Sequence, residues 1–142
     1  MGKIFTTHEE VAQMVREEFG DTQNYLVALK HNNWKKSLLK LLISNIYAAV
    51  DSARQYILVF DEQGIHEKEM SFSDHADFVL IPWHEIQEFD IHPKGKKTII
   101  EVNHLGKIYA YEVEDNEHLL KGNDERLEHL QANDFYRSED SF

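Results

Sequence analysis

The chain has 142 residues, 42% of them hydrophobic, and no cysteine, so we expect a single domain over residues 1–142 without disulfides or cysteine-ligated metal. Its 15 Lys and Arg stand against 26 Asp and Glu, and this net charge of −11 argues against general nucleic-acid binding, which needs surplus basic residues. The negative charge lies almost entirely after residue 60: residues 1–60 hold 7 basic and 6 acidic side chains, and residues 61–142 hold 8 and 20. Without cysteine or an apolar segment of signal-peptide length near Met1, the chain is expected to be cytoplasmic.

The first predicted element is a helix over residues 7–19. Thr7 and Glu10 have the spacing of a capping box, in which the hydroxyl and the carboxylate each accept an N–H of the first turn. Gly20 stands where a helix favours a left-handed residue at its end. The residues between them repeat at helical spacing and form one apolar stripe: Val11, Met14, Val15 and Phe19.

A short apolar strand over residues 25–30 comes next, and then a second helical pattern over residues 32–50. The apolar stripe of this second pattern has lysines lying mostly beside it. Its most apolar run, Leu38 to Val50, has 13 residues, whereas a membrane-spanning helix needs about 20. We therefore expect a helical insertion that does not cross a membrane.

From residue 55 onward the pattern is that of strands. Residues 56–60 are apolar at every position, which predicts a strand with two apolar faces, and Asp61 to Gly64 provides a turn to a return strand over 65–72. A short strand over 78–81 is expected to stop at Pro82, which lacks the N–H that a strand interior needs.

The pattern continues through residues 83–91 to a predicted turn over 92–97. Residues 98–102 and 108–113 then form a second predicted hairpin, whose return strand places three side chains on one face: Tyr109, Tyr111 and Val113.

The last predicted element is a helix that Gly122 breaks or kinks. Four leucines are expected to share one broad face of it: Leu119, Leu120, Leu127 and Leu130. Residues 133–142 are expected to form a loose acidic tail.

Three stretches resemble, in order and spacing, bacterial members of the pleckstrin-homology-like (PH-like) superfamily: Tyr56–Glu69, Val79–Ile91 and Lys97–Glu114. The first has Gly-Ile after its turn, the second the pattern I-P-x-x-x-I, and the third is a hairpin before the closing helix. The resemblance covers residues 24–132 and implies an α+β, mainly β fold, a seven-stranded antiparallel barrel or sandwich with a C-terminal helix. The helix over 7–19 and the insertion over 32–50, after the first strand, depart from the family pattern.

No motif in the sequence predicts catalysis, a cofactor or a metal site. His84-Glu85-Ile86-Gln87-Glu88 resembles the zinc motif H-E-x-x-H, but it ends in glutamate and is expected on a strand. The scattered histidines of the strand region, among them His66, His75 and His92, are interpreted as solvated surface. Residues 95–98 (GKKT) lack the first glycine of a phosphate-binding loop.

Two surfaces remain as predicted contact sites for a partner. The first is the lysine-flanked stripe, which either packs on its own domain, joins copies of the chain, or meets an anionic membrane surface: Trp34, Lys35, Lys36, Leu38, Lys40, Leu42 and Ile46. The second is the basic turn, which is either solvated or contacts an anionic ligand: Lys94, Lys96 and Lys97. The resemblance implies a binding scaffold, so we expect a non-catalytic module that binds a protein partner or self-associates, with anionic lipid head groups as the alternative ligand.

Overall fold

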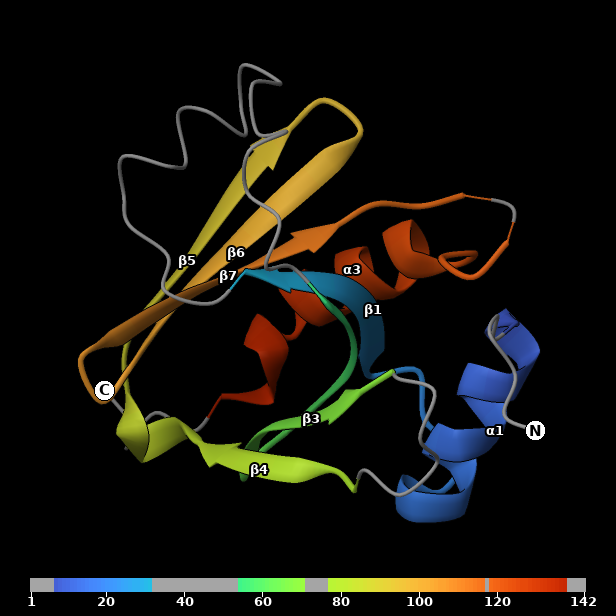
Figure 1. The fold of residues 1–142 in the computed structure, drawn as a ribbon, viewed down its shortest axis with the longest axis horizontal. Coiled ribbons are helices and arrows are strands. Elements are labelled where there is room, and N and C mark those ends of the chain that lie inside the picture. The colour runs from blue at the N-terminus through green and yellow to red at the C-terminus, as the bar shows by residue number, and fades with distance from the viewer. Residues whose placement is uncertain (1–6, 32–53, 71–76, 117, 138–142) are drawn as a thin grey trace.

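The structure, a computed structural model, describes residues 7–31, 54–70, 77–116 and 118–137 (Figure 1). These residues form an α+β fold with one seven-stranded antiparallel sheet, an N-terminal helix and a C-terminal helix. The elements are α1 (His8–Phe19), β1 (Tyr25–His31), β2 (Arg54–Asp61), β3 (Gly64–Glu69), β4 (Val79–Pro82), η1 (Trp83–Glu85), β5 (Ile86–Lys94), β6 (Lys97–His104), β7 (Lys107–Val113), α3 (Asn123–Ala132) and η2 (Asp134–Tyr136). The predicted insertion over 32–50 lies outside the described residues.

The start and end of α1 confirm the predicted capping. The Glu10 N–H donates to Thr7 Oγ1 at 3.2 Å, and the Glu10 carboxylate accepts from the Thr7 N–H at 3.4 Å. At the other end Gly20 has φ +82° and donates its N–H to the Arg16 carbonyl at 2.9 Å. The local sequence therefore determines both ends of this helix.

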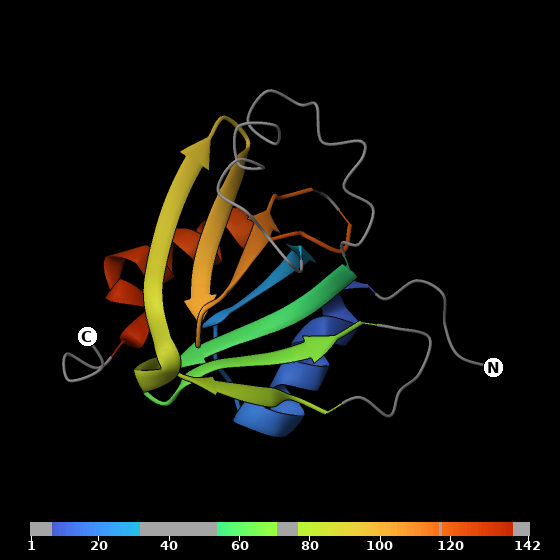
Figure 2. The same cartoon turned by 60° about the vertical axis from the view of Figure 1, so that its left-hand side comes forward.

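The order of strands in the sheet is β4-β3-β2-β1-β7-β6-β5, which places β1 at its centre. Strands β4 and β5 follow each other in the chain, yet they lie at opposite edges of the sheet and only the three residues of η1 join them. Such a short connection requires the sheet to curl until the end of β4 and the start of β5 meet, as Figure 2 shows. Each of the predicted hairpins is present as an antiparallel pair, β2 with β3 and β6 with β7.

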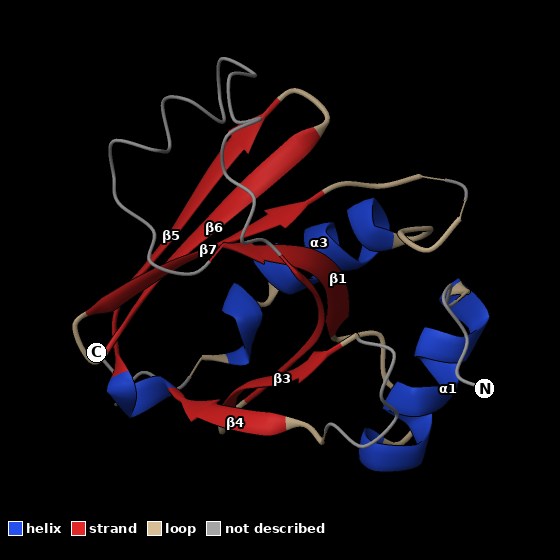
Figure 3. Ribbon diagram, in the orientation of Figure 1, coloured by secondary structure: helices blue, strands red, loops and turns tan. Residues whose placement is uncertain are grey.

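Strand β2 is buried on both faces, as the sequence predicts. Leu58 and Phe60 belong to the main core, which the curled sheet forms with Leu127 and Leu130 of α3. Ile57 and Val59 point to the other face, where they pack with Val11 and Val15 of α1. The two helices therefore cover opposite faces of the sheet (Figure 3).

Trp83 fills the corner at which the two edges of the sheet meet. Its side chain is 1% exposed, and its indole N–H donates to the Asp61 carbonyl at 2.7 Å. The chain at this corner is packed closely, because a Cβ on Gly64 would lie 2.1 Å from the Ile81 carbonyl oxygen. Glycine is needed there since the atom in the way belongs to the backbone of the neighbouring strand.

The predicted boundaries of the turn between β5 and β6 are wrong. The turn expected over 92–97 is shorter, because β5 runs to Lys94 and pairs with Lys97. Pro93 is tolerated inside β5 because, among the described residues, this strand pairs only with β6 and its outer edge needs no N–H donor.

The four leucines expected on one face of the last helix lie on two sides of the sheet. Leu119 and Leu120 precede α3 in a turn and pack with the cluster around α1, whereas Leu127 and Leu130 enter the main core. Gly122 separates the two groups, so the predicted break is present and α3 starts only at Asn123.

The start of the segment expected to be a loose tail is ordered instead. Residues Asp134–Tyr136 form η2, and the Phe135 side chain is buried against the rings of Phe60 and Phe89, with centroids 5.2 and 5.0 Å away. One aromatic residue therefore anchors a stretch whose charge pattern is typical of a solvated terminus. Among the described residues, none of the helices is long and apolar enough to cross a membrane.

Candidate functional site

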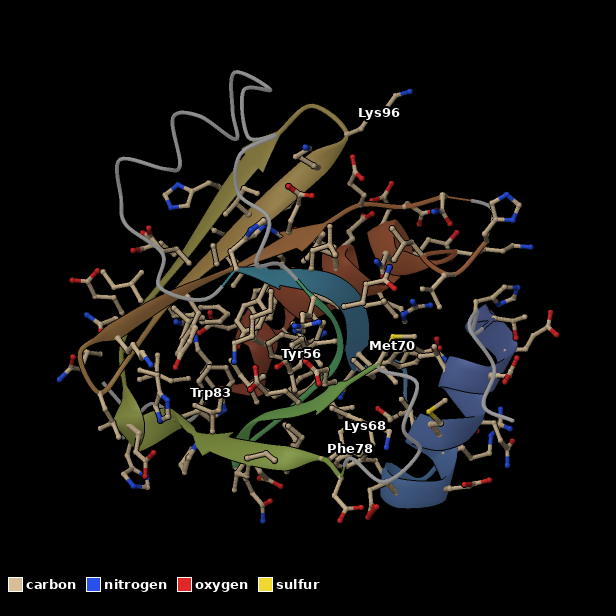
Figure 4. All side chains as sticks on the ribbon, viewed as in Figure 1. Tyr56, Lys68, Met70, Phe78, Trp83 and Lys96 are labelled. Carbon is tan, nitrogen blue, oxygen red and sulfur yellow. The ribbon has the colours of Figure 1, made fainter. Side chains whose placement is uncertain are left out.

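The structure describes part of one predicted contact surface and none of the other. The lysine-flanked stripe, Trp34 to Ile46, lies outside the described residues. Of the basic turn, Lys96 is exposed at the tip of the β5–β6 hairpin (Figure 4), and Lys97 points back to the sheet with its Nζ 3.5 Å from Glu112 Oε1. The side chain of Lys94 is not among those described. In the structure the side chains of Lys96 and Lys97 therefore do not lie together, and contact of this turn with an anionic ligand stays a prediction.

The outer edge of β4 is the apolar surface that the structure exposes most clearly. Val79 is 62% exposed and Leu80 is 40% exposed, on a strand without a charged residue. Within the described residues, β4 pairs with β3 alone. Sheet edges of natural proteins are usually protected by charges, bulges or covering loops, so an uncharged edge with two exposed aliphatic side chains is unusual.

The hydrogen-bond alternation identifies which backbone groups of β4 face outward. The Trp83 N–H donates to the Gln63 carbonyl at 3.2 Å, so Gln63 and Trp83 form a hydrogen-bonded pair. In the same register, the pairs Ile65–Ile81 and Glu67–Val79 follow at every second position, and His66–Leu80 lies between them. Because bonded and non-bonded pairs alternate in an antiparallel ladder, the N–H and C=O of Leu80 point away from β3. One donor and one acceptor therefore face away from β3 at the centre of the edge, and neither is bonded to another strand of the described residues.

The side chains next to this edge are engaged with their own neighbours. Phe78 packs edge-on against Phe19 of α1, with ring centroids 4.9 Å apart, and the Lys68 ammonium lies 5.9 Å from the Phe78 ring (Figure 4). His66, which pairs with Leu80, contacts the Asp61 carboxylate at 2.9 Å. Phe78 and Leu80 are two positions apart and therefore form an apolar surface on one face of the strand, next to its edge.

A buried polar cluster lies on the core side of the sheet, where β1, β3 and β7 contribute one charged or polar residue each. Lys30 Nζ is 2.8 and 2.9 Å from the two Glu67 carboxylate oxygens, and the Tyr111 hydroxyl donates to Glu67 Oε2 at 2.6 Å. The ammonium is also 4.2 Å from the Tyr109 ring centroid and 5.1 Å from that of Tyr56. Carboxylate and aromatic rings together compensate the loss of water around Lys30.

Burial and the Glu67 carboxylate raise the pKa of the Tyr111 hydroxyl well above its usual value. Above about pH 10 the unfolded chain releases this proton while the folded chain retains it, so the free energy of unfolding should fall as the pH rises past that point. Below about pH 10 both states are protonated and the contribution is complete. Urea unfolding of wild type and Tyr111→Phe should show a smaller difference at about pH 11 than at pH 8; an equal difference at both values would contradict the assignment.

Three side chains of metal-ligand type come together on the β5–β6 hairpin: Asp90, His92 and Glu101. One ligand atom of each lies within 4.8 Å of the other two. Asp90 and His92 are two positions apart on β5, and Glu101 lies opposite them on β6. The pairing of the two strands therefore brings the group together, and no pattern along the sequence indicates it. The sequence predicts His92 as solvated surface, whereas in the structure its side chain is 34% exposed and lies beside Asp90 and Glu101.

The sequence matches no protein-family model, and no curated protein matches it.

Proposed function

We propose that the chain is a PH-like domain that acts as a non-catalytic interaction module and binds an extended segment of a protein partner along the edge of β4. The resemblance of residues 24–132 to the superfamily supports the fold part of this proposal, together with the seven antiparallel strands and the closing helix α3. The observation that carries the binding part is the edge itself, with Val79 and Leu80 exposed and the Leu80 backbone groups facing outward.

An extended peptide meets the requirements of this edge. Strand addition would satisfy the outward N–H and C=O of Leu80, and alternate side chains of the peptide would lie on either side of the strand. The apolar surface formed by Phe78 and Leu80 favours aliphatic or aromatic side chains at every second position of the peptide. Pro82 ends the edge, so the bound segment is expected to be short.

Charge favours a basic partner over a second copy of this chain. The net charge is −11, so two copies of the chain would repel each other. A segment with lysine or arginine would instead be attracted. The proposed occupant is therefore an extended segment that alternates apolar residues and carries basic ones.

Selection from a random peptide display library on the full chain tests this proposal. Selected peptides should combine alternating apolar residues with Lys or Arg, and fluorescence anisotropy should show their affinity reduced roughly tenfold or more in Leu80→Pro. Proline at this position removes an N–H that points away from β3, so circular dichroism should show a folded variant. Leu80→Val keeps the N–H and an apolar side chain, and serves as the matched control that retains binding.

Peptides that bind Leu80→Pro as tightly as wild type would overturn the assignment to β4, as would selection that yields no binder sensitive to this substitution. A preference for acidic peptides would contradict the charge argument.

The lipid alternative relies on Lys35, Lys36 and Lys40, which the structure does not describe. Sedimentation of the full chain with anionic and with neutral vesicles separates it from the peptide proposal. Recovery with anionic vesicles alone would favour the lysine-flanked stripe, and equal absence from both pellets would remove this alternative.

A further inference from the structure

The outer face of the β5–β6 hairpin carries a group of side chains that the proposed function does not use. Asp90 pairs directly with Glu101 across the two strands, and His92 follows Asp90 by two positions on the same face. Between them, Ile91 pairs with Ile100, which is buried in the core on the other face. The backbone register therefore holds all three polar side chains on one side of the hairpin.

Two of the three side chains in this group are carboxylates. Carboxylates directly opposite each other on neighbouring strands destabilise a sheet, and the Glu101 side chain is only 5% exposed, where a negative charge costs more than at the surface. A divalent cation between the two strands would offset both negative charges at once. A protonated His92 would offset only one of them.

His92 adds an observation that points to a ligand. Its Nε2 is buried, has no hydrogen-bond partner among the residues that the structure describes, and lies 3.7 Å from Glu101 Oε1. Pro93 follows it, and the residue before a proline is restricted to extended backbone, which limits the directions that the imidazole takes. An imidazole nitrogen that makes no hydrogen bond within the described residues and faces a buried carboxylate is arranged as a metal ligand would be.

We propose that Asp90, His92 and Glu101 bind one zinc ion on the outer face of the β5–β6 hairpin. Zinc accepts one imidazole nitrogen and two carboxylate oxygens at about 2.0–2.2 Å, which places ligand atoms roughly 3.3 Å apart in a tetrahedron. The 3.7 Å between His92 Nε2 and Glu101 Oε1 is close to that value. All three ligand atoms lie within 4.8 Å of one another, and the Asp90 side chain is exposed and therefore free to move closer to the other two. Calcium and magnesium prefer sites made entirely of oxygen ligands.

The consequence of this site is a link between an edge strand and its neighbour. β5 pairs only with β6 among the described residues, so a bound ion adds a second connection beside the hydrogen-bond ladder. Three protein ligands leave the fourth position for water. The site lies on the opposite edge strand from β4 and is independent of the proposed peptide binding.

Calorimetric titration of the chelator-treated full chain with zinc chloride, above the ordinary imidazole pKa of about 6.5, tests the site. Wild type should bind one ion, and His92→Gln and Glu101→Gln should each weaken binding at least about tenfold, since even the hydrogen-bond partners of metal ligands contribute that much. His84→Gln is the matched control, because His84 is 76% exposed and lies 3.9 Å from the Glu85 carboxylate; it should bind zinc as wild type does. Cobalt(II) in place of zinc should give the visible absorption bands of a tetrahedral site in wild type and lose them in His92→Gln.

Absence of saturable zinc binding would overturn the proposal and leave His92 and Glu101 as an ion pair. Equal affinity in wild type and His92→Gln would do the same, as would equal weakening in His84→Gln. His92 is one-third exposed, so its variant is expected to fold even if Glu101→Gln does not.

Discussion

Asn123→Leu is expected to lower the free energy of unfolding by about 3–5 kcal/mol, because it removes the hydrogen bonds of several buried backbone groups at once. Asn123 Oδ1 accepts from the Val27 N–H at 3.1 Å, and Nδ2 donates to the carbonyls of Val27 at 2.8 Å and Glu114 at 2.7 Å. Its side chain is fully buried, so water does not replace these bonds in the variant. Leucine has the same number of side-chain heavy atoms as asparagine, so the variant leaves no cavity and the loss of polar groups is the main change.

Urea unfolding followed by tryptophan fluorescence measures this difference. Asn133→Leu is the matched control, because Asn133 makes one exposed side-chain bond to the His129 carbonyl at 2.8 Å. We expect its effect to stay within about 0.5 kcal/mol of wild type. A loss below about 1 kcal/mol in Asn123→Leu would show that the buried amide does not hold the start of α3 against β1.

Glu67→Leu should destabilise the fold by about 3–5 kcal/mol, since it leaves the buried Lys30 ammonium without its carboxylate and the Tyr111 hydroxyl without its acceptor. The rings around Lys30 retain part of the compensation, because the Tyr109 centroid stays 4.2 Å away. The double variant Lys30→Met/Glu67→Leu should recover much of the loss, since neither partner of this pair then leaves an unpaired buried charge.

The same unfolding assay applied to all three variants gives the coupling between the two residues. We expect the double variant to be more stable than the sum of the single effects by about 1–3 kcal/mol. Glu69→Leu is the control from the same strand: Glu69 contacts Arg54 at 3.6 Å, and Arg54 is 70% exposed, so this surface pair should contribute less than about 1 kcal/mol. Simple additivity of the two single variants would contradict the described ion pair.

The features that could be predicted from the sequence are those determined by neighbours along the chain. The capping box at Thr7 and Glu10, the two apolar faces of residues 57–60 and the stop at Pro82 follow from local pattern and backbone chemistry, and the structure contains all three. The extension of β5 through Pro93 was missed because it depends on the strand being an edge, which no local pattern shows.

The candidate sites were largely hidden from the sequence because they depend on which strands lie side by side. Lys30 looks like a surface lysine at a strand end, and its burial follows only from the proximity of β3 and β7. The grouping of His92 with Glu101 likewise depends on one register, and a shift by a single residue would turn the two side chains to opposite faces. The burial of Phe135 was not predicted either, because a single aromatic residue in an acidic stretch forms no periodic pattern.

The central position of β1 determines when the protein is able to fold during synthesis. This strand takes one neighbour, β2, from the next described segment of the chain and the other, β7, from residues 107–113, and Arg126 bonds the Tyr25 carbonyl from 101 residues further on. A nascent chain therefore exposes one open edge of its central strand until nearly all of the sheet has been translated. We expect folding to be completed after the last strand leaves the ribosome, and chains truncated before β7 to aggregate through that open edge.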